Sequence, residues 1–145
     1  MKALIVYDSS FGNTEKVARA IGDAIGDTVV GQVARVGEVN PTDLKGFDLL
    51  IVGSPTHGGF QTKGIDGLLK ALPALSGLKV AVFDTRARRT IFGYAAPKIS
   101  QRLEKAGGKL VVPPEGFFVT GKQGPLEDGE LDRAAEWVRH MQSAK

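Results

Sequence analysis

Short apolar runs recur along the chain and alternate with longer segments of mixed polarity. Each run is rich in Val, Ile, Leu or Phe, is too short for a helix, and is closed by polar residues, Gly or Pro. Runs of this kind are typical of strands buried on both faces of a sheet. The pattern predicts buried strands at Ala3–Tyr7, Leu49–Gly53 and Val80–Phe83, a weaker strand at Leu110–Val112, and a more mixed edge strand at Val29–Val36.

The segments between these runs carry apolar residues three and four positions apart, the spacing that places one apolar stripe on one helix face. The predicted stripes are Val17, Ile21, Ala24 and Ile25; Ile65, Leu68, Leu69 and Leu72; Ile99, Leu103 and Ala106; and Leu131, Ala135, Val138 and Met141. Stop signals follow at Gly26, Pro73 and Gly107–Gly108, and Pro97 suits a first helical turn. Residues Gly37–Gly46 are predicted to form a loop with at most one turn of helix.

Strand and helix thus alternate about five times along the chain. This alternation predicts an α/β fold, a doubly wound three-layer sandwich around a five-stranded parallel sheet. Open sheets of this kind bind ligands outside the carboxyl ends of their strands. We therefore expect functional residues in the turns after Tyr7, Gly53 and Phe83.

Composition limits the class of protein. The 145 residues, 42% hydrophobic and 24% charged, predict one globular domain spanning residues 1–145. No apolar run approaches the ~20 residues of a membrane-spanning helix, and the first run is too short for a signal peptide, so we expect a cytoplasmic protein. A sequence without cysteine has no disulfides or iron–sulfur ligands, and with only His57 and His140 we expect no metal site.

The charge balance is mildly basic, with a net charge of +3 and a pI of about 9.3. Basic residues are scattered except at Arg86, Arg88 and Arg89. The sequence has no basic stripe interleaved with aromatic residues, so we predict no nucleic-acid binding. The balance favours partners with acidic surfaces.

The first turn, Ser9–Thr14, concentrates small polar side chains between a strand and a helix. A helix N-terminus offers unpaired N–H groups to an anion, and Gly12 lets the backbone approach closely. Further donors are Ser9, Ser10, Asn13 and Thr14. The turn contains no lysine or arginine and no GxxxxGK[ST] motif, so it suits a retained phosphate monoester better than a reacting triphosphate. An ordinary helix cap, with Glu15 complementing the dipole, is an equal alternative at this point.

The second turn, Ser54–Phe60, combines an imidazole, a phenyl ring and two adjacent glycines. Gly58 and Gly59 permit backbone conformations, and reversals of them, that residues with a Cβ resist. His57 has no partner carboxylate visible in the sequence, so we predict no nucleophilic catalysis. A solvent-facing loop that binds nothing is the alternative.

The third turn is predicted to begin at Asp84 and to run past Arg86 to Tyr94, mixing cations with aromatic rings. Arginine in such a turn suits stacking on a planar ligand or pairing with the carboxylates of a partner. For Arg88 and Arg89 a solvated basic loop is an equal alternative. Together, the turns offer a phosphate cradle and two loops that bracket something flat, which is the shape of a flavin mononucleotide (FMN) site.

These motifs resemble those of the flavodoxin family, which includes the short-chain flavodoxins and flavodoxin-like domains. The stretch "YDSSFGNTE" is similar to the family's phosphate loop, [ST]-x-[ST]-G-x-T, with Phe11 in place of the usual Thr. The stretch "GSPTHGG" is similar to the loop on the inner flavin face, and the resemblance extends through "GPLEDGELDRAAEWV" near the C-terminus. It implies the strand order 2-1-3-4-5 and noncovalent binding of one FMN.

The resemblance also implies a role for the residues of each turn. The FMN phosphate would be bound by Ser9, Ser10, Gly12, Asn13 and Thr14, with Phe11 giving its backbone N–H at most. The flavin ring would be lined by Pro55, Thr56, His57, Gly58 and Gly59, and on a third side by Asp84, Thr85, Arg86 and Tyr94. The peptide that reverses beside the flavin on reduction falls at Gly58–Gly59. His57 stands where the family usually has a large aromatic residue, so we expect a lower, pH-dependent flavin affinity.

The expected function is electron transfer between redox partner proteins through bound FMN, by a monomer that is not itself an enzyme. Typical flavodoxins are acidic, and the basic pI of this chain predicts a smaller penalty on reduced flavin and partners with acidic docking surfaces. One alternative is an FMN-dependent NAD(P)H or quinone reductase, for which no insertion is visible. The other is a module of this fold with weak or no flavin binding. Phosphoacceptor receiver domains share the topology but need an Asp where this chain has Ser54.

Overall fold

The computed structural model describes residues 2–26, 30–88 and 92–143, and its strands and helices alternate as predicted. The strands are β1 (Lys2–Tyr7), β2 (Val30–Arg35), β3 (Leu49–Pro55), β4 (Lys79–Ala87), β5 (Lys109–Leu110) and β6 (Glu115–Val119). The α-helices are α1 (Asn13–Ile25), α2 (Lys63–Lys70), α3 (Ala95–Lys105) and α4 (Glu130–Ser143). Two 3-10 helices, Val36–Glu38 and Pro41–Gly46, lie in the region predicted to be mostly loop. Within the described ranges no helix is long and apolar enough to cross a membrane.

The strands form one parallel sheet in the order β2-β1-β3-β4-β5, which confirms the predicted order. The predicted edge strand lies at the β2 edge, although Val29 falls outside the described residues. Strand β6 was not predicted from the sequence. It pairs with β4 alongside β5, so two segments share the fifth position in the sheet. Because Pro113 and Pro114 have no N–H to donate to the ladder, they separate β5 from β6.

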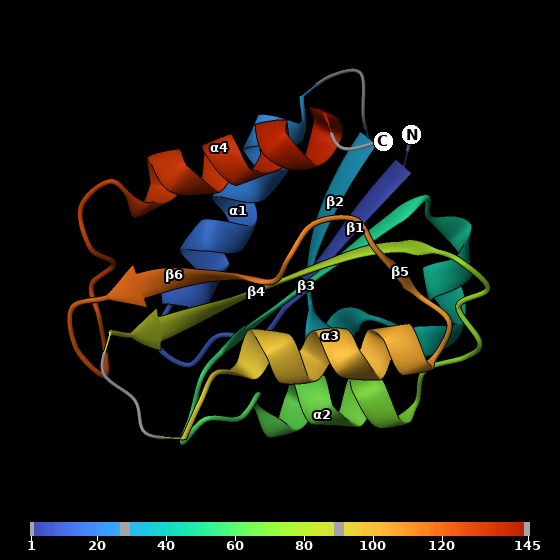
Figure 1. Ribbon diagram of the computed structural model, residues 1–145, viewed down its shortest axis with the longest axis horizontal. Coiled ribbons are helices and arrows are strands. Elements are labelled where there is room, and N and C mark those ends of the chain that lie inside the picture. Colours follow the sequence, from blue (N-terminus) through green and yellow to red (C-terminus); the bar gives the residue numbers. More distant parts are fainter. Residues whose placement is uncertain (1, 27–29, 89–91, 144–145) are drawn as a thin grey trace.

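Helices cover both faces of this sheet. Figure 1 shows α1 and α4 on one side, and α2 and α3 on the other. Alternate residues of the central strands divide between two apolar clusters: Ile5 and Ile51 pack with α1 and α4, whereas Val6 and Val52 pack with α2 and α3. Strands that are apolar on both faces belong at the centre of such a sandwich, which is why β1 and β3 read as continuous apolar runs.

The helix boundaries follow the stop signals. Gly26 ends α1 with a φ of 81°, α2 ends three residues before Pro73, and Ala106–Gly107 follow the end of α3. Pro97 lies in the first turn of α3, as predicted. The stripe predicted for the last helix was wrong in part: Leu131 is 44% exposed, and the buried residues of α4 include Ala134 and Trp137.

At the carboxyl end of the sheet, β3 and β4 run further than predicted. Ser54 pairs with Asp84 and Pro55 with Thr85, and Asp84 also pairs with Gly116 of β6. Residues Asp84–Arg86 therefore belong to a strand, and the prediction that they begin a turn was wrong. The third turn instead follows Ala87, and Arg89 lies outside the described residues.

Candidate functional site

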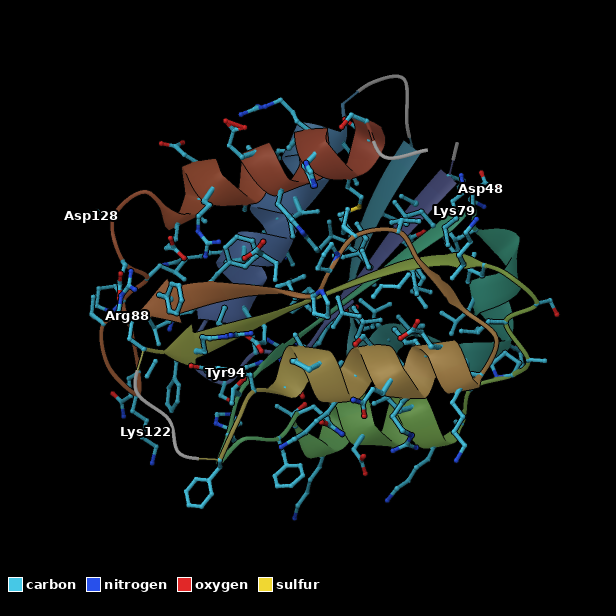
Figure 2. All side chains as sticks on the ribbon, in the orientation of Figure 1. Asp48, Lys79, Arg88, Tyr94, Lys122 and Asp128 are labelled. Carbon is cyan, nitrogen blue, oxygen red and sulfur yellow. The ribbon has the colours of Figure 1, made fainter. Side chains whose placement is uncertain are left out.

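The turns predicted to carry function meet at the end of the sheet where β1, β3 and β4 finish. Figure 2 shows Arg88, Tyr94 and Lys122 at this end and Asp48 and Lys79 at the opposite one. A hollow of about 210 Å³ opens among the turns. Its lining residues are Ser10, Phe11, Asn13, Thr14, Pro55, Thr56, His57, Thr85, Arg86, Ala87, Val119 and Lys122.

The first turn leaves the start of α1 without a side-chain cap. Gly12 occupies the N-cap position with a φ of 88°, a left-handed conformation that glycine adopts without steric cost. The Ser9 hydroxyl accepts a hydrogen bond from the Gly12 N–H (3.0 Å) and so shapes the turn, but no side chain among the described residues caps the helix. The ordinary cap that the sequence left open is therefore absent, and the first N–H groups of α1 remain for another acceptor.

Two buried polar residues at the start of α1 are tied to the neighbouring elements. The Thr14 hydroxyl lies 2.7 Å from that of Thr85 in β4. The Asn13 amide donates to the carbonyl of Gln123 (3.1 Å), which lies in the loop between β6 and α4. Both side chains are therefore held in position before any ligand binds.

The second turn is a tight reversal closed by His57 and Phe60. The His57 N–H donates to the Phe60 carbonyl (2.8 Å), and the Phe60 N–H donates to the His57 carbonyl (3.0 Å). Gly58 and Gly59 have φ values of 57° and 86°, the left-handed conformations that this kind of turn requires and glycine allows. A Cβ on Gly59 would collide with the backbone carbonyl of Phe92, so the second and third turns touch here.

A hydroxyl–imidazole contact links the first turn to the second. The Ser10 Oγ lies 3.0 Å from the His57 Nε2, and the direction of this hydrogen bond depends on the imidazole tautomer. Within the described part of the chain, no carboxylate contacts the His57 ring. The pair therefore lacks the orienting third group of a catalytic triad.

The ion pair between Asp84 and Arg86 dominates the third side of the hollow. The Arg86 guanidinium donates to both carboxylate oxygens of Asp84, at 2.6 and 2.9 Å. The second oxygen also accepts from the N–H of Ala96 (2.9 Å) at the start of α3. The guanidinium stacks 3.6 Å from the centre of the Tyr94 ring. Burial raises the pKa of the Asp84 carboxyl, and Arg86 opposes that rise.

The structure brings most of the predicted site residues together but leaves some outside the hollow. The predicted residues that do not line it are Ser9, Gly12, Gly58, Gly59, Asp84 and Tyr94. The Asp84 side chain is fully buried behind Arg86. Its carboxylate accepts hydrogen bonds from the Arg86 guanidinium and from the Ala96 N–H at the start of α3. Ser9 shapes the first turn through its hydroxyl, and the glycines shape the turns through their backbones.

The hollow has a fourth wall that was not predicted from the sequence. Ala87, Val119 and Lys122 line the hollow from β4, β6 and the loop after β6. Because β6 was not predicted, nothing in the sequence placed the loop that follows it beside the first turn. The first turn itself has no cation, but the hollow receives cations from Arg86 and Lys122.

Comparison with known proteins identifies the family. The model of the flavodoxin family matches residues 5–137. A flavodoxin of Maridesulfovibrio salexigens is 30% identical over 144 residues, covering 94% of this chain and 93% of that protein. A flavodoxin structure from the domain Archaea has a TM-score of 0.79 at 27% identity, covering 97% of this chain and 96% of that one. Oxidised flavodoxin 1 of Bacillus cereus shares the fold with a TM-score of 0.85 at 19% identity, covering 100% and 99% of the two chains. The chain belongs to the flavodoxin family, whose members bind FMN and transfer electrons to redox partner proteins.

Proposed function

We propose that this protein is an electron carrier that holds one FMN noncovalently in the hollow at the carboxyl end of the sheet. The observation that carries this proposal is the uncapped start of α1 facing a hollow lined with hydroxyl, amide and cationic groups. Such a start is a binding site for the phosphate of a mononucleotide. The proposed unit is the whole chain, residues 1–145, acting as one monomeric domain in the cytoplasm.

The donors around the hollow fit the phosphate end of FMN. The N–H groups at the start of α1, the hydroxyls of Ser10 and Thr14, and the amide of Asn13 would surround the phosphate oxygens. Gly12 brings the backbone close, and Phe11 contributes its N–H, since its side chain is 46% exposed and offers no hydroxyl. Ser9 would also donate to the phosphate, because its hydroxyl accepts from Gly12 and keeps its own O–H as a donor.

The flavin ring would lie at the rim of the hollow. A volume of about 210 Å³ is smaller than the roughly 300–1,000 Å³ typical of a site that encloses a whole cofactor. It suits the phosphate and part of the sugar chain, and leaves the ring beside Pro55, Thr56 and His57. Thr85 and Arg86 form the opposite side, with Tyr94 behind the guanidinium.

Bound FMN supplies the redox chemistry, and the protein supplies binding, orientation and electrostatics. Arg86 places a fixed cation at the hollow, held by Asp84 and Tyr94. A cation at this position lowers the free-energy cost of negative charge on a ligand.

The partner would dock over the mouth of the hollow. Phe60 and Phe92, from the second and third turns, are 58% and 63% exposed, and exposed aromatic side chains are typical of contact surfaces. The net charge of +3 favours a partner with an acidic docking surface. Electron transfer to such a partner should slow as ionic strength rises.

The absorbance spectrum of the purified protein, recorded through a stepwise reduction, tests the proposed function. We expect a yellow protein, or an apoprotein that FMN titration turns yellow, whose flavin bands bleach reversibly as reductant is added. A protein that binds no FMN would contradict the proposal. Rapid NAD(P)H oxidation with quinone by the purified protein alone would instead identify the reductase.

One observation favours a second candidate, a module of this fold with weak flavin binding. The second and third turns touch at Gly59 and Phe92, and the Lys98 ammonium donates to the Gly59 carbonyl across them. A ring inserted between these turns must part them, which costs binding free energy. FMN titration separates the candidates: a micromolar or tighter dissociation constant supports the carrier, and a millimolar one supports the module.

A further inference from the structure

The loop between β6 and α4 is a closed turn whose ends are bonded to each other. The Thr120 N–H donates to the Pro125 carbonyl (2.8 Å), and the Glu127 N–H donates to the Phe118 carbonyl (2.9 Å). Near the tip, the Gly124 N–H donates to the Gly121 carbonyl (3.1 Å). These bonds fix the path of the backbone and place Lys122 at the tip of the turn.

The tip of this loop packs on the start of α1. The Asn13 amide donates to the Gln123 carbonyl, and a Cβ on Gly124 would collide with the same amide group. Asn13 is buried, so this contact leaves little room for movement. Lys122 thus lines the same hollow as Ser10, Asn13 and Thr14.

Lys122 and Arg86, two cations that line the hollow among the described residues, differ in whether a carboxylate pairs with them. Asp84 offsets part of the positive charge of Arg86 through two hydrogen bonds. Over residues 2–26, 30–88 and 92–143, no carboxylate lies within ion-pair distance of Lys122. An ammonium without a carboxylate partner, on a residue that lines a hollow with N–H, hydroxyl and amide donors, is suited to an anion.

We propose that Lys122 binds the FMN phosphate and supplies the positive charge that the first turn lacks. This proposal rests on the proposed function and assigns one residue of the site. The phosphate of FMN is a dianion near pH 7, so one lysine offsets about half of its charge. The remaining negative charge would be stabilised by the positive end of the α1 dipole. Lys122 therefore makes the site selective for phosphorylated flavin over riboflavin, which has the same ring and no phosphate.

Affinities for FMN and riboflavin, measured on the wild type, Lys122→Gln and Lys79→Gln, test this role. Lys79 is an exposed lysine at the opposite end of the sheet, so its variant matches the change in net charge without touching the hollow. We expect Lys122→Gln to weaken FMN binding about tenfold, in the range of a charge-assisted hydrogen bond, and to leave riboflavin binding unchanged. Lys79→Gln should alter neither affinity, and Lys122→Arg should keep FMN binding within about twofold of the wild type.

Two further measurements, the salt dependence of FMN binding and stabilisation by inorganic phosphate, do not depend on the redox reaction of the flavin. The FMN dissociation constant of the wild type should rise more steeply with salt than that of Lys122→Gln. Inorganic phosphate should raise the melting temperature of the wild-type apoprotein more than that of Lys122→Gln. Equal FMN affinity in the two proteins, or equal losses of FMN and riboflavin affinity, would overturn the role of Lys122. If inorganic phosphate stabilises the wild type through Lys122 but FMN does not bind, Lys122 stands as a phosphate-binding residue, and both its role toward FMN and the proposed function fail.

Discussion

Arg86 and Asp84 form a two-bond ion pair, 2.6 and 2.9 Å long, between neighbouring residues on the same face of β4. The Asp84 side chain is fully buried, and the Arg86 side chain is 14% exposed, with its open side toward the hollow. The same carboxylate holds the start of α3 through the Ala96 N–H. This pair therefore joins the sheet, a helix and the candidate site, so its loss should be felt in stability as well as in binding.

Removing the arginine alone should destabilise the protein more than removing the whole pair. Arg86→Met leaves a buried carboxylate without its cation, a change that typically costs about 3–5 kcal/mol. The double variant Asp84→Asn, Arg86→Met removes both charges and should recover a large part of that loss. Urea unfolding at pH 7 measures the free energies of unfolding. Arg88→Met, which removes an exposed arginine paired with Glu127, is the control and should have a far smaller effect.

The raised pKa of Asp84 predicts how stability depends on pH. The folded protein binds this proton at a higher pH than the unfolded chain, whose ordinary Asp pKa is 3.8. The contribution of Asp84 to the free energy of unfolding should therefore increase as pH falls from neutral through its raised pKa toward 3.8. Asn at position 84 does not titrate, so the wild type should gain stability relative to Asp84→Asn over that window. A difference that is flat or shrinks as pH falls would contradict the direction of the shift.

Substitutions of His57 separate its hydrogen-bond contact with Ser10 from its role as a stacking surface for the flavin ring. His57→Trp loses the 3.0 Å contact but adds an aromatic face at the rim of the hollow. We expect FMN affinity to rise several-fold, since an aromatic pair is worth about 0.5–1.5 kcal/mol. His57→Ala removes the same contact without adding a ring and should bind FMN more weakly than the wild type. Flavin fluorescence quenching measures both affinities, and weaker binding by the Trp variant would show that the histidine contact matters more than stacking.

Adjacent glycines in the second turn should respond differently to alanine. A Cβ on Gly58 meets nothing within 4 Å, so Gly58→Ala adds only the strain of a left-handed residue, about 1 kcal/mol. A Cβ on Gly59 collides with the Phe92 carbonyl, so Gly59→Ala must push the second and third turns apart. We expect a small fall in melting temperature for Gly58→Ala and a larger one for Gly59→Ala. Equal falls would show that the two turns separate freely.

The sequence predicted the alternation of strands and helices and the position of the first turn, because buried parallel strands and helix stop signals leave a strong local pattern. The strand order was implied by the resemblance to the flavodoxin family. The features that the sequence did not predict depend on tertiary contacts. Asp84 reads as the start of a polar turn because its charge is paired only when Arg86 folds beside it in β4. The position of Lys122 could not be predicted because Pro113 and Pro114 interrupt the apolar pattern before β6, so this strand was not recognised. The pairing of β6 with β4 brings the loop that contains Lys122 to the start of α1.

The buried face of α4 differs from the apolar stripe predicted from the sequence, and substitutions on the two faces can test this difference. The sequence pattern assigned Leu131 to the buried stripe, but Leu131 is 44% exposed and Trp137 is buried. The Trp137 ring makes edge-to-face contacts with Phe83 and Phe117, whose ring centres lie 6.1 and 6.0 Å away. Trp137→Ala should therefore lower the free energy of unfolding by about 3–5 kcal/mol, whereas Leu131→Ala should lower it by less than about 0.5 kcal/mol. Urea unfolding of both variants provides the measurement, and comparable losses would mean that Leu131 packs against the core as the sequence pattern predicted.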